Sequence, residues 1–344
     1  MLRTYANRVL DEGADYTGQV GAVAVSLWRG AYVLEDVSIL KRGHAVPVPF
    51  LECPRIDCSI EWRALLHGVA RAQLVLDRPA LNFVAGPTPE QTQTGADAPW
   101  LSVINDLSPF RIDRAQVKSG TIRFHAFHTS PQVHVHLTEV NALLTNLTNI
   151  RDDVKPLVAE IHGTAVAMES GRLEFDMECD PEAHFPTFAL ATRLLGLDVN
   201  RLNSLARAYG DFDFESGRFD LVVEASAHQG RIEGYAKPLF RHVIVVGPRD
   251  VRRGDPLQLL WQSLVGIAGA VFKNQDRDQF GTRIDFDGDL NDPHISILEA
   301  VGNVLRNAFV RAYLPRFEGK IAPAAAPAAA EHGETHEGPA HEHP

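Results

Sequence analysis

The chain has 344 residues, of which 45% are hydrophobic and 22% charged, which excludes a wholly disordered chain, a collagen-like repeat and a polytopic membrane protein. Its 33 basic and 44 acidic residues give a formal net charge of -11, so we expect no nucleic-acid partner. The three cysteines cannot form a disulfide framework and match no zinc pattern, so the sequence predicts no cofactor.

The first residues, 1–14, are expected to form a short helical stub ahead of a β-rich body over 15–321. The N-terminus lacks the apolar segment of a signal peptide, and no window reaches the roughly 18 to 20 apolar residues of a membrane span. The nearest window, 257–272, is short and carries polar residues. It is predicted to be a buried or half-buried helix, and the alternative is a contact with a membrane surface or hydrophobic ligand.

Alternation of apolar and polar residues with a period of two is the dominant pattern in the body. Successive side chains of a strand point to opposite faces, so each alternating segment is predicted to be a half-buried antiparallel strand. Continuous Val/Ile runs, typical of a buried parallel sheet, are nearly absent. The alternating segments are 121–126, 133–138, 173–178, 219–225 and 283–290.

Three of these segments are preceded by a Ser-Gly pair, at Ser119-Gly120, Ser170-Gly171 and Ser216-Gly217. Glycine tolerates the positive φ of a hairpin turn, so each pair is expected to begin a returning strand. The spacing fits either an internal repeat or the ordinary turns of a β protein.

Helices are predicted between the strands. Residues 198–210 place apolar side chains on one helical face, and 296–315 combine a capping box with helical spacing. The segments 61–68 and 142–161 are weaker helix candidates. Residues 322–344 are rich in Ala, Pro, His and Glu without an aromatic residue, so they are expected to be a disordered tail. The predicted fold is α+β, mostly antiparallel β, with several amphipathic helices.

Histidines of one predicted hairpin form the strongest metal candidate. With a turn at 129–131, His125 is predicted to lie roughly opposite His136, with His134 next along the same face. Three imidazoles can bind zinc, but an ordinary solvent-facing strand explains the pattern better, so no metal is predicted. The chain has no nucleophile elbow, phosphate loop or dinucleotide fingerprint, so no catalytic residue is predicted and we expect a protein that is not an enzyme.

Several short motifs occur in order in the first eighty-odd residues: Tyr16-Thr17-Gly18, Ser26–Tyr32, Pro47–Phe50, Trp62–Gly68 and Asp77–Phe83. This series resembles the AsmA-like bacterial envelope proteins, in particular a compact branch catalogued as a domain of unknown function. Residues 198–225 and 281–315, which include Asn307-Ala308-Phe309, resemble the same branch. The likeness covers nearly everything before the tail.

The resemblance implies a curved, groove-like antiparallel sheet with an apolar concave face, in a protein anchored in the inner membrane and facing the periplasm. Larger relatives are thought to move phospholipid towards the outer membrane. Members of the branch usually begin with a membrane helix ahead of the segment that matches Arg3–Asp11, and this sequence shows none. Residues 1–14 are therefore expected to follow an upstream anchor. The chain is too short to bridge two membranes alone.

We therefore expect a non-enzymatic envelope protein on the periplasmic side of the inner membrane, with a role in envelope biogenesis or lipid transport. Its expected partners are a lipid or other hydrophobic ligand and further envelope proteins. The alternative is a structural or interaction scaffold whose apolar face is fully covered. The residues expected to line the apolar groove are Ile122, Phe124, Leu173, Phe175, Phe219, Leu221, Ile284 and Phe286.

Overall fold

The computed structural model describes residues 2–11, 15–26, 30–43, 45–60, 72–95, 112–146, 159–180, 183, 187–210, 213–246, 279–281 and 283–289. The chain divides into two units, Met1–Tyr313 and Leu314–Pro344, and all of these residues belong to the first. The predictions for 61–68, 257–272, 296–315 and 322–344 lie outside the described residues.

Strands make up most of the described residues. Up to Gln91, the described elements are α1 (Leu2–Asp11), β1 (Tyr16–Ser26), β2 (Ala31–Lys41), β3 (Leu51–Ile60), β4 (Ala72–Asp77), β5 (Ala80–Ala85) and the 3-10 helix η2 (Pro89–Gln91). The later elements are β6 (Ile112–Ala126), β7 (Val133–Thr145), β8 (Ala159–Ala167), β9 (Gly171–Cys179), β10 (Phe188–Asp198), the 3-10 helix η3 (Val199–Leu202), α4 (Asn203–Gly210), β11 (Asp213–His228), β12 (Arg231–Val246), β13 (Gln279–Gly281) and β14 (Ile284–Asp289).

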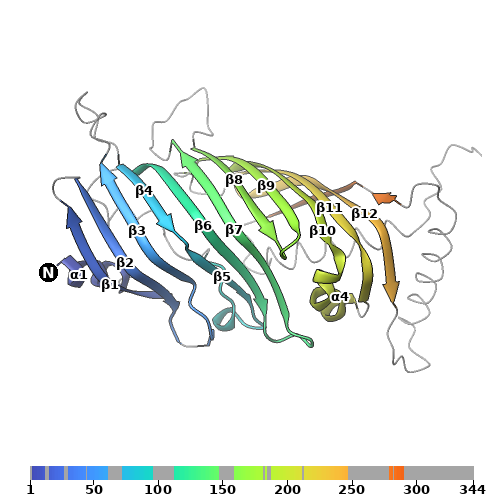
Figure 1. Ribbon diagram of the computed structural model, residues 1–344, viewed down its shortest axis with the longest axis horizontal. Coiled ribbons are helices and arrows are strands. Elements are labelled where there is room, and N and C mark those ends of the chain that lie inside the picture. Colours follow the sequence, from blue (N-terminus) through green and yellow to red (C-terminus); the bar gives the residue numbers. More distant parts are fainter. Residues whose placement is uncertain are drawn as a thin grey trace, which may run out of the picture. The chain divides into compact units, whose positions relative to one another are not determined.

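The fourteen strands of the described residues belong to one sheet (Figure 1). Their order is β1-β2-β3-β4-β6-β7-β8-β9-β10-β11-β12-β13, with β14 beside β12 and β5 beside β3 and β6. Neighbouring strands are antiparallel except that β4 and β5 both run parallel to β6. These two short strands follow one another along β6, because β4 pairs with its first half and β5 with its second. The mostly antiparallel β fold predicted from alternation is confirmed.

The alternating segments lie in β6, β7, β9, β11 and β14, as predicted. The helix predicted over 198–210 is also confirmed, as η3 followed directly by α4. The helix predicted over 142–161 is wrong at both ends, because 142–145 complete β7 and 159–161 begin β8. Apolar residues on both faces of these strand ends imitate helical spacing.

Four residues with a left-handed backbone lie at one level of neighbouring strands. They are Asp36 in β2, Arg78 between β4 and β5, Ser119 in β6 and Glu139 in β7, with φ of 53, 51, 50 and 51°. Arg78 lies beside Ser119, because β4 and β5 pair with β6 at the same offset. Asp77 pairs with Lys118 before this point, and Ala80 pairs with Thr121 after it. We call this the kink level. Each left-handed residue turns the strand, so the side-chain alternation changes phase there.

Two of the three Ser-Gly pairs do not stand where the sequence predicts them. Ser119-Gly120 lies inside β6, and Ser216-Gly217 lies inside β11, where the register with β12 also shifts. Only Ser170-Gly171 stands at the start of a strand, β9. Two of the three pairs therefore mark bends within long strands rather than turns between them.

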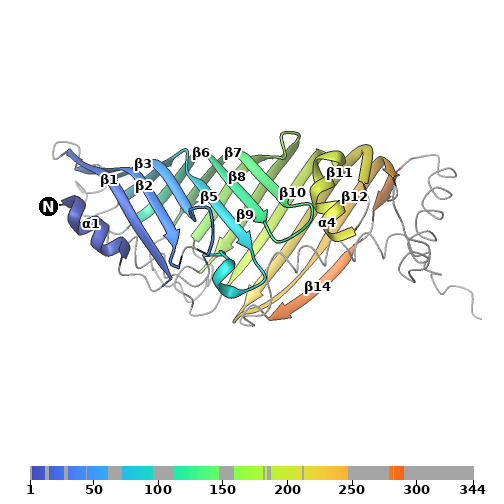
Figure 2. The same ribbon diagram turned by 90° about the horizontal axis from the view of Figure 1, so that it is seen from below.

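Helices α1 and α4 lie near opposite ends of the sheet (Figure 2). Helix α1 buries Ala6 and Leu10, and a Cβ added to Gly18 of β1 would lie 2.8 Å from Cβ of Leu10, so the glycine allows the close approach. At the other end, the side chain of Asn203 in α4 donates to the carbonyl of Phe214 at 2.9 Å and accepts from its N–H at 2.8 Å. These two bonds attach α4 to the start of β11.

Candidate functional site

One face of the sheet is apolar across its width. Residues paired across neighbouring strands stand on the same side, so a row can be followed through the register from strand to strand. The first row contains no charged residue: Val25, Tyr32, Cys58, Leu74, Ala115, Leu144, Ile161, Met177, Leu190, Ala225, Gly234 and Phe286.

The second row is displaced by two residues along each strand and also lacks charge. Its members are Val23, Leu34, Ile56, Leu76, Val117, Ala142, Gly163, Phe175, Thr192, Val223, Ala236 and Ile284. We call the side of the sheet that carries the two rows the apolar face.

The apolar face continues through the kink level although the phase of the alternation changes. In β7 the apolar positions are odd up to Leu137 and even from Val140. Leu137 pairs with Ala167 and Ala142 pairs with Gly163, and both partners lie in β8, which has no left-handed residue. Positions 163 and 167 are an even number of residues apart in a regular strand, so they share a face. Leu137 and Ala142 therefore share it too.

The predicted lining residues occupy this face. Phe175, Ile284 and Phe286 are members of the two rows. Leu173 and Leu221 belong to the adjoining row, because both pair with Leu194 of β10 between them.

The remaining predicted lining residues lie farther along the same face. Ile122 pairs with Leu137, and Phe124 lies two residues beyond it on β6. Phe219 lies two residues before Leu221 on β11 and pairs with Phe240 of β12. The register thus brings all eight predicted positions to one side of the sheet.

Sequence reasoning missed the contribution of the first five strands. Val23, Leu34, Ile56 and Leu76 continue the second row from β1 to β4. The signal was present as short runs of alternation on either side of the kink level. No run there is long enough to stand out, because the kink level crosses β2 at Asp36 and separates β4 from β5 at Arg78.

Two aromatic rings of the apolar face lie over glycines of the neighbouring strand. A Cβ added to Gly163 would lie 2.2 Å from Cζ of Phe175, and one added to Gly234 would lie 2.9 Å from Cζ of Phe286. Because both distances are shorter than a van der Waals contact, the absence of a side chain lets each ring rest against the backbone. The glycines therefore determine where these rings sit.

The chain's own helices cover both ends of the apolar face. At the β1 end, α1 closes a core that includes Tyr16, Val20 and Phe50. At the other end, η3 and α4 close a second core, in which Phe219 is only 3% exposed and its ring centroid lies 4.8 Å from that of Phe240. Phe219 therefore belongs to a closed core, and we exclude it from the open part of the predicted lining.

Between the two covered ends, many apolar side chains of the two rows are half-buried. The half-buried members of the rows here are Val117, Ala142, Leu144, Ile161, Phe175, Met177, Leu190, Val223 and Phe286. We call these residues the middle of the apolar face.

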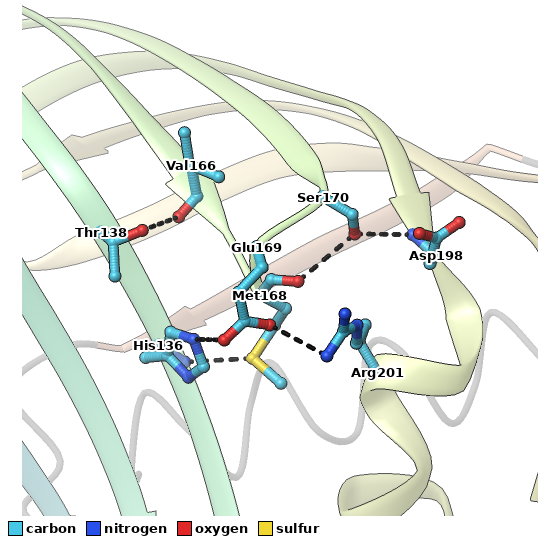
Figure 3. Close-up of polar contacts among 8 residues, drawn as sticks. All are labelled: His136, Thr138, Val166, Met168, Glu169, Ser170, Asp198 and Arg201. Atoms are coloured by element: carbon cyan, nitrogen blue, oxygen red, sulfur yellow. Dashed lines mark hydrogen bonds and ion pairs between the residues drawn. The ribbon is translucent and has the colours of Figure 1, made fainter.

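The turn between β8 and β9 holds η3 against the sheet (Figure 3). Met168 and Glu169 form this turn with left-handed φ of 47 and 57°. One carboxylate oxygen of Glu169 lies 2.6 Å from Nε2 of His136 in β7, and the other lies 3.4 Å from Nη1 of Arg201 in η3. The sulfur of Met168 accepts the N–H of His136 at 3.3 Å. Through Glu169, η3 at this end of the apolar face is therefore linked both to β7 and to the turn between β8 and β9.

The opposite face of the sheet is polar. Nδ1 of His162 lies 2.6 Å from Oδ1 of Asp176 on the next strand, and this hydrogen bond raises the pKa of His162. A hollow of about 820 Å³ lies on this side and includes the guanidinium of Arg283, whose Cζ is 4.1 Å from the ring centroid of Tyr235. The row that crosses it is His162, Asp176, Ala191, Glu224, Tyr235 and Asp285.

The predicted pairing of His125 with His136 is wrong, although His134 and His136 share a face with His125 as predicted. His125 lies opposite His134, with 2.9 Å between their Nδ1 atoms, and not opposite His136. His136 is paired with Arg123 instead. The hairpin is centred one residue earlier than a pairing of His125 with His136 requires. Burial, with the nearby charges of His134 and Arg123, lowers the pKa of His125.

Among the described residues, no three His, Cys, Asp or Glu side chains are arranged to hold a metal ion. Within the same ranges, no helix has the length and apolar character needed to cross a membrane. No model of a known protein family matches the chain, and no curated protein matches it. The resemblance to the AsmA-like proteins therefore rests on the motifs quoted above.

Proposed function

We propose that the chain binds lipid-like molecules on the middle of the apolar face and performs no catalysis. The observation that carries this proposal is the pair of register rows that cross twelve strands without a charged residue. An apolar face of this extent must be covered by the chain itself, by a partner or by a ligand. Helix α1 and the η3–α4 segment account for its ends, and lipid would complete the burial of its middle.

An acyl chain matches the chemistry of this face. It has no hydrogen-bonding groups, and the rows offer it none apart from the side chains of Tyr32, Cys58 and Thr192. Neighbouring strands lie about 4.8 Å apart, so the middle of the apolar face, from β6 to β14, extends for about 34 Å along a row, longer than one extended acyl chain. The face therefore offers space along the row for a chain to lie in more than one position.

The finer parts of the proposal follow the resemblance to the AsmA-like proteins. We propose that the sheet curves into a groove with the apolar face inside and that amphipathic helices assist in covering it. The protein would act on the periplasmic side of the inner membrane, alongside other envelope proteins, in envelope biogenesis or lipid transport.

A scaffold with a fully covered apolar face is the second candidate. The cores around Tyr16 and Phe219 favour it, because they show the chain covering its own apolar face at both ends. In that case the middle would be dry, and a carboxylate placed there would be buried without a partner, at a cost of several kcal/mol.

Adjacent residues of β10 distinguish the two candidates. Leu190 is half-buried on the apolar face, whereas Ala191 is exposed on the polar face. The experiment compares wild type, Leu190→Glu and the matched control Ala191→Glu, each purified from its native membrane fraction and analysed by thermal melting and lipid mass spectrometry.

Lipid binding predicts a wild type with bound lipid, a folded Leu190→Glu variant depleted of lipid, and a control that resembles wild type. A lipid-free wild type together with an unfolded Leu190→Glu variant would overturn lipid binding in favour of the scaffold.

A further inference from the structure

The outer edge of the sheet at β1 is divided into two halves. In the first half, the side chain of Asn7 in α1 accepts the N–H of Val20 at 2.7 Å, so the helix occupies this part of the edge. In the second half, Gly21–Ser26, no other described strand pairs with the outer side of β1. A row of backbone donors and acceptors is therefore available for another strand.

The free half of the edge lacks the usual protection against pairing. Natural edge strands are commonly blunted by charged side chains or proline, and Gly21–Ser26 contains neither. Gly21, Ala22, Ala24 and Val25 are exposed, and Val25 reaches 47%. This segment is also where both rows of the apolar face end, at Val23 and Val25.

The sequence of this segment is complementary to itself. Val23 and Val25 stand on the apolar face, and Ala22, Ala24 and Ser26 stand on the other. In an antiparallel pair centred on Ala24, Val23 of each copy lies opposite Val25 of the second copy on the same face. Small residues meet on the other face, and no charges are brought together. Pairs of β-branched side chains in these positions stabilise neighbouring strands.

We propose that two copies of this chain pair edge to edge through residues 22–26 of β1, antiparallel, with the two-fold axis at Ala24. The pairing stops short of Val20, so it leaves the hydrogen bond to Asn7 in place. The apolar faces of the two copies then adjoin, because each row of one copy meets a row of the other. This inference does not depend on lipid binding.

The contact is self-limiting, since a two-fold pair uses the free edge of both copies and leaves none for a third. Five residues a side bury much less than the roughly 1,200 to 2,000 Å² of a standard stable interface. The dimer is therefore expected to dissociate on dilution, and a concentration series is required to observe it.

Charge placed at the two-fold axis tests the pairing. Sedimentation analysis of the full chain over a concentration series should show a monomer–dimer equilibrium. Ala24→Lys and Ala24→Glu should each raise the dimer dissociation constant about fivefold, since each places like charges directly opposite one another. Mixing the two variants should restore the dimer, because Lys then faces Glu. The control Ala191→Lys, exposed on the polar face of β10, should leave the constant at its wild-type value.

Three results would overturn the proposal: a monomer at every concentration, a dimer unaffected by both Ala24 variants, or a mixture no stronger than either variant alone. Circular dichroism establishes that the variants are folded. Ala24→Cys supplies a test without added charge, since a short thiol cross-linker should join its two-fold-related sulfurs and should not join those of Ala191→Cys. Absence of a cross-linked dimer would likewise count against the pairing.

Discussion

Asp220 is expected to be a principal polar support of the sheet near α4. It is 7% exposed, and its Oδ1 accepts the N–H of Gly196 at 2.7 Å. Gly196 has a left-handed φ of 72° at the bend of β10, and the other carboxylate oxygen of Asp220 bonds the guanidinium of Arg241 in β12. One carboxylate therefore joins β10, β11 and β12. Asp220→Ala removes both interactions together.

The expected loss follows from these two contacts. Hydrogen bonds to charged groups contribute about 1.5 to 3 kcal/mol each, and breaking a buried ion pair costs about 3 to 5 kcal/mol. The side chain of Arg241 is 36% exposed and can be rehydrated, so the lower part of this range applies. We expect Asp220→Ala to reduce the free energy of unfolding by about 3 kcal/mol, and Asp220→Asn, which keeps an acceptor for Gly196, by about half as much.

Urea unfolding of the full chain measures this loss. The matched control is Asp285→Ala, because Asp285 is 70% exposed and its ion pair with Arg283, at 2.7 Å, is expected to contribute less than about 0.5 kcal/mol. A loss below about 1 kcal/mol for Asp220→Ala, or equal losses for Asp220→Ala and the control, would refute the reasoning.

Two further predictions concern the middle strands. Because the hydrogen bond to Asp176 raises the pKa of His162, this pair should stabilise the fold below about pH 6.5, and the contribution should disappear as pH rises through the folded-state pKa. NMR titration should show that Asp176→Asn lowers the pKa of His162; an unchanged value contradicts the pairing. Gly163→Ala should destabilise the sheet by about 1 to 3 kcal/mol, because the new methyl group meets the ring of Phe175. Urea unfolding should show a smaller loss when Phe175→Leu is already present, and strictly additive losses would contradict this contact.

Strands with long uninterrupted alternation could be predicted from the sequence. In β9, Leu173, Phe175 and Met177 alternate with acidic residues, and the structure places this segment as expected. The strands β2, β4 and β5 could not be predicted in this way, since Asp36 interrupts the alternation of β2 and Arg78 separates β4 from β5. A left-handed residue inside a strand has no strong sequence signal unless it is glycine.

The phase change in β6 is visible in the sequence, but the Ser-Gly pair within it favours a different interpretation. Apolar residues stand at 115 and 117 before Ser119-Gly120 and at 122 and 124 after it. That change of parity is typical of one extra residue inside a strand, whereas a Ser-Gly pair alone suggests a turn. Register across the hairpin was harder to predict, because moving its centre by one residue exchanges the partner of His125.

The alternation could identify the face of the sheet that each lining residue occupies, but it could not predict how exposed the side chain is. Alternation assigns Phe219 and Phe175 to the same side of the sheet, and the register agrees. Whether a lining residue is covered depends on where η3 and α4 pack. That position depends on contacts between residues distant in sequence, such as that of Glu169 with Arg201 of η3. The pattern within a strand carries no information about such contacts.

The kink level also restricts how this chain can change length during evolution. A deletion in β6 that leaves the left-handed Ser119 in place, such as loss of Arg123, would move the later residues by one position and turn their side chains to the polar face. The flanking strands β5 and β7 would keep their own phase, so Phe124 would face the wrong side between correctly placed neighbours. Loss of Ser119 itself is the exception, because it would remove the kink and the phase change together. Insertions and deletions should therefore accumulate in the connections, such as 127–132, and be rare within the strands.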